Sequence, residues 1–258
     1  MRTVDEFSLT TSLLKKFYLN KISVSEKSQD LTKILKKHPK LVVALNHGPM
    51  AGALAGLVGI ADMLQKHGGS SRTPFGITWR TFYQLPVSKQ IFTYLTQVDR
   101  GLSFDDASSL LSDSGFTDCF IMPEGELCNF GNGLDIQPFL SPRFIELAIQ
   151  NDIPILVVTH QGSEKWAWPM TIKDQYKSLF SWLPQNMKAV FDKSSIISIP
   201  KPFKQKLNLT ISFYLYQPKL TKADLKKDKE ARLEQLTAES NHVRERMQRM
   251  VMQLQTES

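Results

Sequence analysis

The 258-residue chain is short of cysteine and of long apolar runs, and both shortages narrow its class. Its two cysteines, Cys119 and Cys128, are too few for a disulfide framework or a structural zinc site, which favours a reducing compartment. The most apolar stretch, residues 49–61, is about 13 residues long, whereas a bilayer-spanning helix needs ~20. No apolar segment follows Met1, so we expect no secretory signal.

Acidic residues are outnumbered, with 25 Asp and Glu against 32 Lys and Arg, a net charge of +7. A basic excess predicts an anionic partner, which charge alone leaves open between a membrane surface, a phosphate and nucleic acid. Nucleic-acid binding is the weakest of these hypotheses, because no motif for it is present and the C-terminal charges are of mixed sign. A hydrophobic content of 41% is enough to build a core, so we expect a folded domain.

Short apolar runs alternate with amphipathic stretches along most of the chain. We expect helices over residues 50–66 and 141–150, and strands over 41–45, 76–79, 93–98, 116–122, 153–159 and 207–216. This alternation predicts an α/β fold, with a mostly parallel central sheet flanked by helices. The predicted division is a basic amphipathic helical segment (1–40), an α/β domain (41–217) and a charged C-terminal helix (218–258).

The two ends and the tryptophans leave alternatives open. Apolar residues from Leu13 to Ile22 recur every three to four positions among lysines, which fits a helix packed on the domain or an interfacial membrane contact. The stripe from Leu225 to Leu254 favours a packing face or coiled-coil seam over a membrane anchor. Trp166, Trp168 and Trp182 fit either a membrane interface or a core.

His47 is the strongest candidate for chemistry. It comes directly after the predicted strand 41–45 and before Pro49, which suits the first turn of a helix. Ligands of α/β proteins bind at this edge of the sheet. A nearby helix N-terminus would also keep the imidazole neutral, as a general base near pH 7 requires. His160 also follows a buried strand, where it fits either a ligand contact or a loop histidine, and the loop histidine is the favoured interpretation.

Four segments together resemble the glycerophospholipid acyltransferase superfamily, the lysophosphatidic acid acyltransferase-like enzymes. That family has Asn-His-x-x-x-x-Asp, an apolar run ending in Ile-Asp-Arg, then Phe-Pro-Glu-Gly-Thr-Arg, and an apolar strand opening with a triplet like Val-Pro-Ile. The matching segments, within a resemblance that spans residues 40–217, are Asn46-His47, Val98-Asp99-Arg100, Met122-Pro123-Glu124-Gly125 and Ile153-Pro154-Ile155.

The resemblance implies transfer of a fatty acyl group from acyl-CoA or acyl-carrier protein to a lipid hydroxyl, with no metal and no cofactor beyond that co-substrate. It makes His47 the general base and Arg100 the ligand of an acceptor phosphate, with Asn46, Glu124 and Gly125 at the substrate. Backbone N–H groups near Gly48 would stabilise the oxyanion. It further implies a lipid acceptor and a cytoplasmic protein, peripheral on the inner face of a membrane. The sequence predicts no oligomeric state.

Two departures from the family pattern bear on catalysis. The position five residues after His47 is Gly52 where the family has an acid, and Glu126-Leu127 replaces Thr-Arg. Three explanations remain: another carboxylate, such as Asp99 or Asp118, orients His47; a backbone carbonyl does so; or the protein is a catalytically impaired lipid-binding relative. The diacylglycerol acyltransferase-like branch, which has His-Pro-His-Gly without the spaced acid, is faintly similar at Asn46-His47-Gly48 and would take a neutral acceptor.

Overall fold

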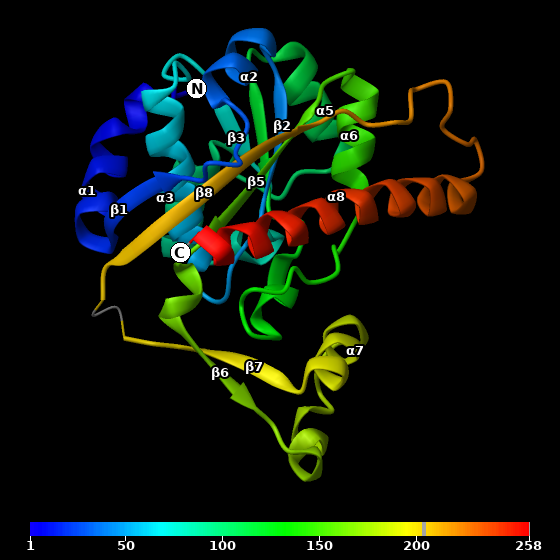
Figure 1. Cartoon of the computed structure of the whole chain (residues 1–258). Helices are drawn as coiled ribbons and strands as arrows, with labels where there is room; N and C mark the ends of the chain where they lie inside the picture. Colours follow the sequence, from blue (N-terminus) through cyan, green and yellow to red (C-terminus); the bar gives the residue numbers. More distant parts are fainter. Residues whose placement is uncertain (203–204, 258) are drawn as a thin grey trace.

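A six-stranded sheet forms the centre of the computed structural model, which describes residues 1–202 and 205–257 (Figure 1). The strand order is β1-β8-β5-β2-β4-β3. The strands are β1 (Leu19–Val24), β2 (Leu41–Leu45), β3 (Pro74–Gly76), β4 (Asp118–Ile121), β5 (Ile155–Gln161) and β8 (Leu207–Tyr216). Only β5 and β8 pair antiparallel within the described sheet. The predicted α/β class with a mostly parallel sheet is confirmed.

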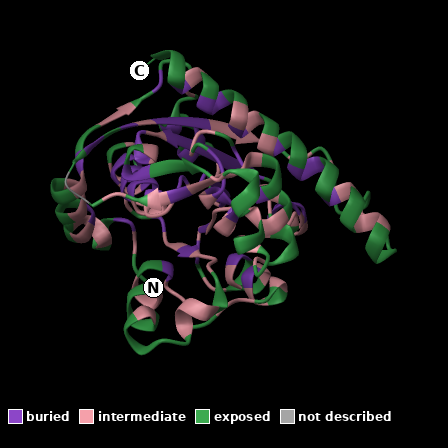
Figure 2. Cartoon of the chain, turned by 90° about the horizontal axis from the view of Figure 1, so that it is seen from below, coloured by how far each residue is buried: buried purple, intermediate pink, exposed green. Residues whose placement is uncertain are grey.

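Helices cover both faces of the sheet. One face carries α1 (Ser8–Tyr18), α2 (Leu31–Lys37) and α3 (Gly52–Lys66), and the other carries α5 (Phe104–Asp113), α6 (Arg143–Asn151) and α8 (Lys229–Glu257). Side chains of β2 alternate between the two cores, with Val43 and Leu45 in the first and Val42 and Ala44 in the second. Figure 1 shows α8 crossing the sheet, and Figure 2 shows buried segments concentrated between the helical layers.

A smaller unit extends from the carboxyl end of β5 (Figure 1). Its antiparallel hairpin consists of β6 (Ala167–Thr171) and β7 (Ile196–Pro200), joined through α7 (Gln185–Ser194). A separate small core holds it together, built on Leu127, Phe130 and Phe191. The remaining elements are α4 (Pro86–Thr96) and the 3₁₀ helices η1 (Asp5–Phe7), η2 (Arg80–Tyr83), η3 (Gly125–Asn129), η4 (Ser163–Trp166) and η5 (Asp174–Phe180).

Three predicted elements differ from the structure, one in type and two in their bounds. The strand expected over residues 93–98 is the end of α4, which begins at Pro86 and ends where Gln97 adopts a left-handed φ of 60°. Its apolar residues recur every four positions, at Val87, Ile91 and Leu95, which is a helical spacing. The N-terminal helix expected to reach Ile22 ends at Tyr18, because residues 19–24 pair with β8 as a strand. The expected strand 76–79 lies at 74–76.

Burial bears on the alternatives that the sequence left open for the C-terminal helix and for the three tryptophans. Six stripe residues of α8 are buried against the domain, which makes it a packing face: Leu236, Val243, Met247, Met250, Val251 and Leu254. Trp166 is also a core residue, whereas Trp168 and Trp182 are exposed. No helix in the described part of the chain is both long enough and apolar enough to cross a membrane.

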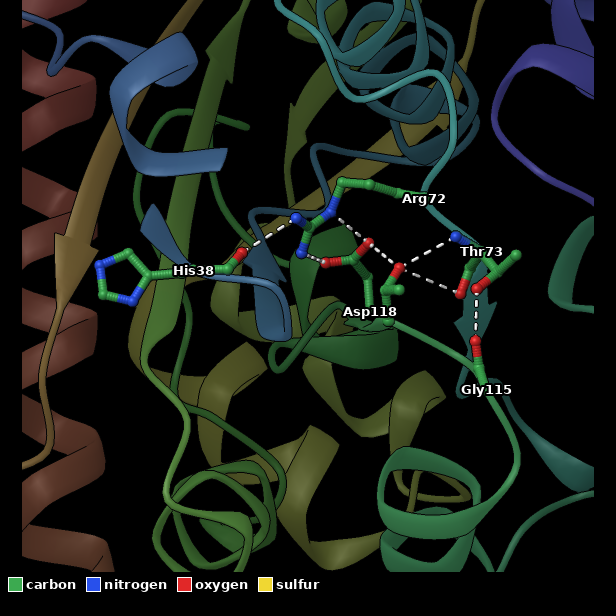
Figure 3. A network of polar contacts seen from close by, with 6 residues as sticks. His38, Arg72, Thr73, Gly115 and Asp118 are labelled. Atoms are coloured by element: carbon green, nitrogen blue, oxygen red, sulfur yellow. Dashed lines mark hydrogen bonds and ion pairs between the residues drawn. The ribbon is translucent and has the colours of Figure 1, made fainter. Parts of the chain in front are cut away.

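A buried ion pair ties β3 and β4 together at the amino end of the sheet (Figure 3). The Arg72 guanidinium donates to both carboxylate oxygens of Asp118, at 2.7 and 2.5 Å, and to the carbonyl of His38 at 3.0 Å. Both partners are almost inaccessible, Arg72 being 7% and Asp118 1% exposed. Two charge-assisted bonds in fork geometry offset part of the desolvation cost of these charges.

Candidate active site

His47 occupies a sharp turn between β2 and α3. Gly48 has a φ of +67° and Met50 a φ of +52°, so α3 begins at Gly52 and not at Pro49 as the sequence suggested. A Cβ on Gly48 would lie 2.5 Å from Ser163 Oγ. Both the left-handed backbone and this close approach favour glycine at that position.

The His47 ring is oriented by its own loop. Nδ1 lies 2.8 Å from the carbonyl oxygen of Gly48. Because a carbonyl only accepts hydrogen bonds, Nδ1 carries the proton and Nε2 of the neutral ring keeps a free lone pair. Among the described residues nothing bonds Nε2. Cys128 Sγ also lies 3.1 Å from Nδ1, and burial raises the pKa of that thiol well above 9.0, so it is neutral.

Electrostatics favour the neutral imidazole. Burial lowers the pKa of His47 from 6.5, against the opposing effects of the Gly48 carbonyl and the Glu126 charge. The ring is therefore uncharged near pH 7, in the state that accepts a proton at Nε2. The Glu126 carboxylate, placed near enough to raise this pKa, would stabilise the imidazolium once it forms.

Glu124 is buried directly behind the His47 loop, being 2% exposed. Its Oε2 accepts the backbone N–H of His47 at 3.0 Å, and its Oε1 accepts the backbone N–H of Gln137 at 2.8 Å. Burial raises the pKa of this carboxyl to about 7, although both N–H groups act in the opposite direction. The contacts observed for Glu124 are thus with the backbone of two loops that meet at the carboxyl edge of the sheet.

Asn46 and His160 form a second buried group on the opposite side of the His47 loop. The Asn46 side chain accepts the backbone N–H of His160 at 2.8 Å and donates to its carbonyl at 3.1 Å. The ring Nε2 of His160 lies 3.0 Å from the carbonyl oxygen of Asn46. The expectation of a loop histidine at 160 is wrong, because pairing with β8 extends β5 to Gln161.

Gly125 and Arg100 occupy different parts of this edge. Gly125 has a φ of +52°, and a Cβ there would meet Leu140 Cδ1 at 2.2 Å, so the turn after Glu124 needs glycine. The Arg100 side chain is 67% exposed and lies 3.2 Å from Asp106. It follows α4 rather than a strand, and its neighbour Gly101 packs on Arg80, just beyond β3. The strand order places β3 two strands from β2, so Gly101 and its neighbour Arg100 are on the β3 side of the sheet.

The two carboxylates considered for orienting His47 are elsewhere. Asp118 is opposite Leu41 in the sheet register and is paired with Arg72. Six residues of extended chain place it about 20 Å from His47. Asp99 is exposed and acts on Tyr83, whose pKa it helps to raise after the larger effect of burial. The acceptor for the Nδ1 proton is the backbone carbonyl of Gly48, which supports the second of the three explanations.

Several neighbours of His47 were not predicted from the sequence, in which Glu126 is marked only as a departure from the third block. Cys128, Glu126 and Ser163 reach the site through turns that follow β4 and β5, and a lone residue in a turn predicts no contact. The adjacency of β2 with both strands brings them together. The strand ends on either side of His47 were the only available clue, because carboxyl ends of parallel strands share an edge.

Two surface hollows lie away from His47. One of about 250 Å³ is lined by β1–α2 residues with His67 and Phe213, and one of about 560 Å³ by polar residues of α5 and α6 with Lys222 and Arg232. Within residues 1–202 and 205–257, no cluster of three His, Cys, Asp or Glu side chains is arranged to hold a metal ion.

Comparisons with known proteins found a similar solved structure. No family model matches the chain, and no curated protein matches it. The chain is similar to the crystal structure of the 1-acyl-sn-glycerophosphate (LPA) acyltransferase PlsC from Thermotoga maritima, at 15% identity and a TM-score of 0.48. The similarity covers 95% of this chain and 79% of that one.

Proposed function

We propose that this protein transfers a fatty acyl group from an acyl thioester, acyl-CoA or acyl-carrier protein, to a hydroxyl of a glycerolipid or lysophospholipid, with His47 as general base. The observation that carries the proposal is the bond between Nδ1 of His47 and the Gly48 carbonyl, which leaves Nε2 free to accept a proton. The four ordered sequence blocks supply the reaction class. No metal or further cofactor takes part in the proposed steps.

The reaction balances with one base. Nε2 of His47 takes the proton of the acceptor hydroxyl as its oxygen attacks the thioester carbonyl, which forms a C–O bond and a tetrahedral oxyanion. Collapse breaks the C–S bond, and the leaving thiolate takes the proton back from the imidazolium. Gly48 N–H has no acceptor among the described residues, and it is the donor we assign to the oxyanion. The Glu126 charge favours the transient imidazolium.

Substrate binding is assigned by position. Arg100 is the group proposed to hold an acceptor phosphate, because it is exposed and carries its charge on the same edge of the sheet as His47. Exchange of Asp106 for phosphate as its partner costs little, since such exposed pairs contribute roughly 0–1 kcal/mol. Asn46, Glu124 and Gly125 would shape the site around the acceptor.

A membrane surface is the proposed partner, and two helices are suited to it. The exposed stripe of α1 is Leu9, Leu13 and Phe17, and that of α4 is Val87, Ile91 and Leu95. The helices adjoin where Tyr94 donates to or accepts from Thr10 at 2.6 Å and packs edge-on against Phe7. The charged residues of the two helices are all lysines: Lys15, Lys16 and Lys89. Lys15 pairs with Asp62 at 2.7 Å, which leaves Lys16 and Lys89 to complement anionic lipid. We place the protein peripherally, on the inner face of a membrane in the cytoplasm.

The test is a product assay across acceptors. Purified protein is incubated with acyl-CoA or acyl-carrier protein and with glycerol phosphate, lysophospholipid or diacylglycerol, and esters are identified by mass spectrometry. We expect acceptor-dependent thioester cleavage with formation of one class of ester. A bound acyl chain without turnover on any acceptor would overturn the proposal and support the impaired lipid-binding relative, the alternative that Gly52 favours by its lack of an acid.

A further inference from the structure

The peptide unit between Asn46 and His47 is held at both ends by buried side chains. Its carbonyl oxygen lies 3.0 Å from His160 Nε2, and its N–H donates to Glu124 Oε2 at 3.0 Å. His160 lies on β5, and Glu124 lies in the turn after β4. These two strands flank β2. Because a peptide unit is planar, contacts at both ends block its rotation, and this plane sets the direction in which the His47 side chain leaves the backbone.

The protonation of His160 follows from its partners. A carbonyl oxygen only accepts, so Nε2 of His160 carries the proton and Nδ1 has the lone pair. Ser163 Oγ, 3.3 Å from Nδ1, then donates its hydroxyl proton. His160 and Ser163 are each 2% exposed, so water does not compete for these bonds. The hydroxyl, the ring and the Asn46 carbonyl form one directed chain of hydrogen bonds that ends on the residue before His47.

Three glycines leave the space that His160 and Ser163 occupy. A Cβ on Gly48, Gly52 or Gly56 would approach Ser163 Oγ to 2.5 Å, Ser163 Oγ to 3.0 Å or the His160 ring to 2.6 Å, respectively. The glycine found where the related enzymes carry an acid therefore faces Ser163. At Gly52, the hydrogen-bonded pair of His160 and Ser163 fills the space that a longer side chain would occupy.

We propose that His160, oriented by Ser163, is a positioning residue that holds the Asn46–His47 peptide so that Nε2 of His47 points at the acceptor hydroxyl. The pair would replace, by backbone control, the orientation that an acid provides directly in enzymes with the spaced motif. The effect on rate rests on the proposed function, whereas the effect on the His47 ring does not. Displacement of a catalytic group by about 1 Å costs on the order of 100-fold in rate, which sets the expected size of the effect.

The experiment compares His160→Leu with His160→Gln in the full-length protein. Leucine removes the donor to the Asn46 carbonyl, whereas the glutamine amide nitrogen replaces it. We expect kcat of His160→Leu to fall about 100-fold with KM changed less than threefold, and His160→Gln to recover kcat to within tenfold of the native protein. Equal kcat in the two variants would overturn the proposal, because the two side chains are similar in size and only glutamine can donate to the Asn46 carbonyl.

A spectroscopic measurement separates this inference from the proposed function and does not depend on either variant folding. Long-range ¹H–¹⁵N spectra of the native protein report which ring nitrogen is protonated in each histidine. We expect His160 protonated at Nε2 and His47 at Nδ1. The opposite tautomer at His160 would overturn the positioning role even in an active enzyme. If both histidines have the expected tautomers but the protein shows no turnover, the proposed function is contradicted and the positioning role of His160 is not.

Discussion

The Asp118→Asn substitution tests whether the buried ion pair stabilises the fold without serving the site. Asparagine keeps the shape of the carboxylate but removes its charge, so the Arg72 guanidinium stays buried and unneutralised. Arg72 is 7% exposed, and its bonds to Asp118 are 2.7 and 2.5 Å long. Breaking one partner of such a buried pair costs about 3–5 kcal/mol, a large share of the roughly 5–15 kcal/mol that stabilises a typical domain.

The assay is urea unfolding followed by circular dichroism at pH 7, with Asp192→Asn as the matched control. Asp192 pairs with Lys188 at 2.8 Å, and both side chains are about half exposed, so its loss should cost less than about 1 kcal/mol. Folded Asp118→Asn protein should keep the native pH dependence of turnover. A loss of stability below 1 kcal/mol would refute the energetic reasoning. A changed pH profile would mean that Asp118 acts on His47 after all.

Three further predictions concern the site and the surface. Burial raises the pKa of Glu124 from 4.5 to about 7, so its contribution to stability is fully present below pH 4.5 and is lost as pH rises through 7. Relative to Glu124→Gln, the native protein should therefore lose roughly 3 kcal/mol between pH 4.5 and 8 in unfolding experiments, and a constant difference would contradict this. Gly56→Ala places a Cβ 2.6 Å from the His160 ring, and this overpacking should destabilise the fold by about 1–3 kcal/mol. The higher helix propensity of alanine offsets about 1 kcal/mol of that loss. A variant more stable than the native protein would disprove the close packing. Ile91→Asp should reduce co-sedimentation of the protein with anionic vesicles severalfold. Leu233→Asp on α8 should not, although Leu233 is 53% exposed and Ile91 is 52% exposed. Equal binding of the two variants would rule out the α4 stripe as a membrane contact.

The sequence predicted the four central strands of the sheet, β8, β5, β2 and β4, because they are apolar and bounded by clear breaks. β2 and β8 lie within their predicted ranges, because apolar runs of that length, continuous in β2 and alternating in β8, are typical of strands. Residues 93–98 failed because a short apolar run fits a strand or a buried helix equally well, and the proline that starts α4 lies seven residues upstream. At the N-terminus, pairing with a strand almost 190 residues away overrode the local helical spacing.

The candidate site was predictable only where one residue stood at a recognisable boundary. His47 could be chosen because a strand ends at Leu45 and a turn follows. Its surroundings depend on strand order, which local sequence does not encode: His160 is adjacent because β5 lies beside β2, and Glu124 because β4 lies on the other side. The carbonyl that orients Nδ1 belongs to a backbone conformation at Gly48, and no side-chain motif reports it.

The rate of acyl transfer by His47→Ala tests the account most directly. It is measured beside the native protein and His242→Ala, a control that removes an exposed imidazole from α8. Loss of a general base costs typically 10²–10⁴-fold, so we expect His47→Ala to lose at least about 100-fold in kcat while His242→Ala stays at the native rate. Transfer by His47→Ala within tenfold of the native rate would contradict the assignment of Nε2 as the base.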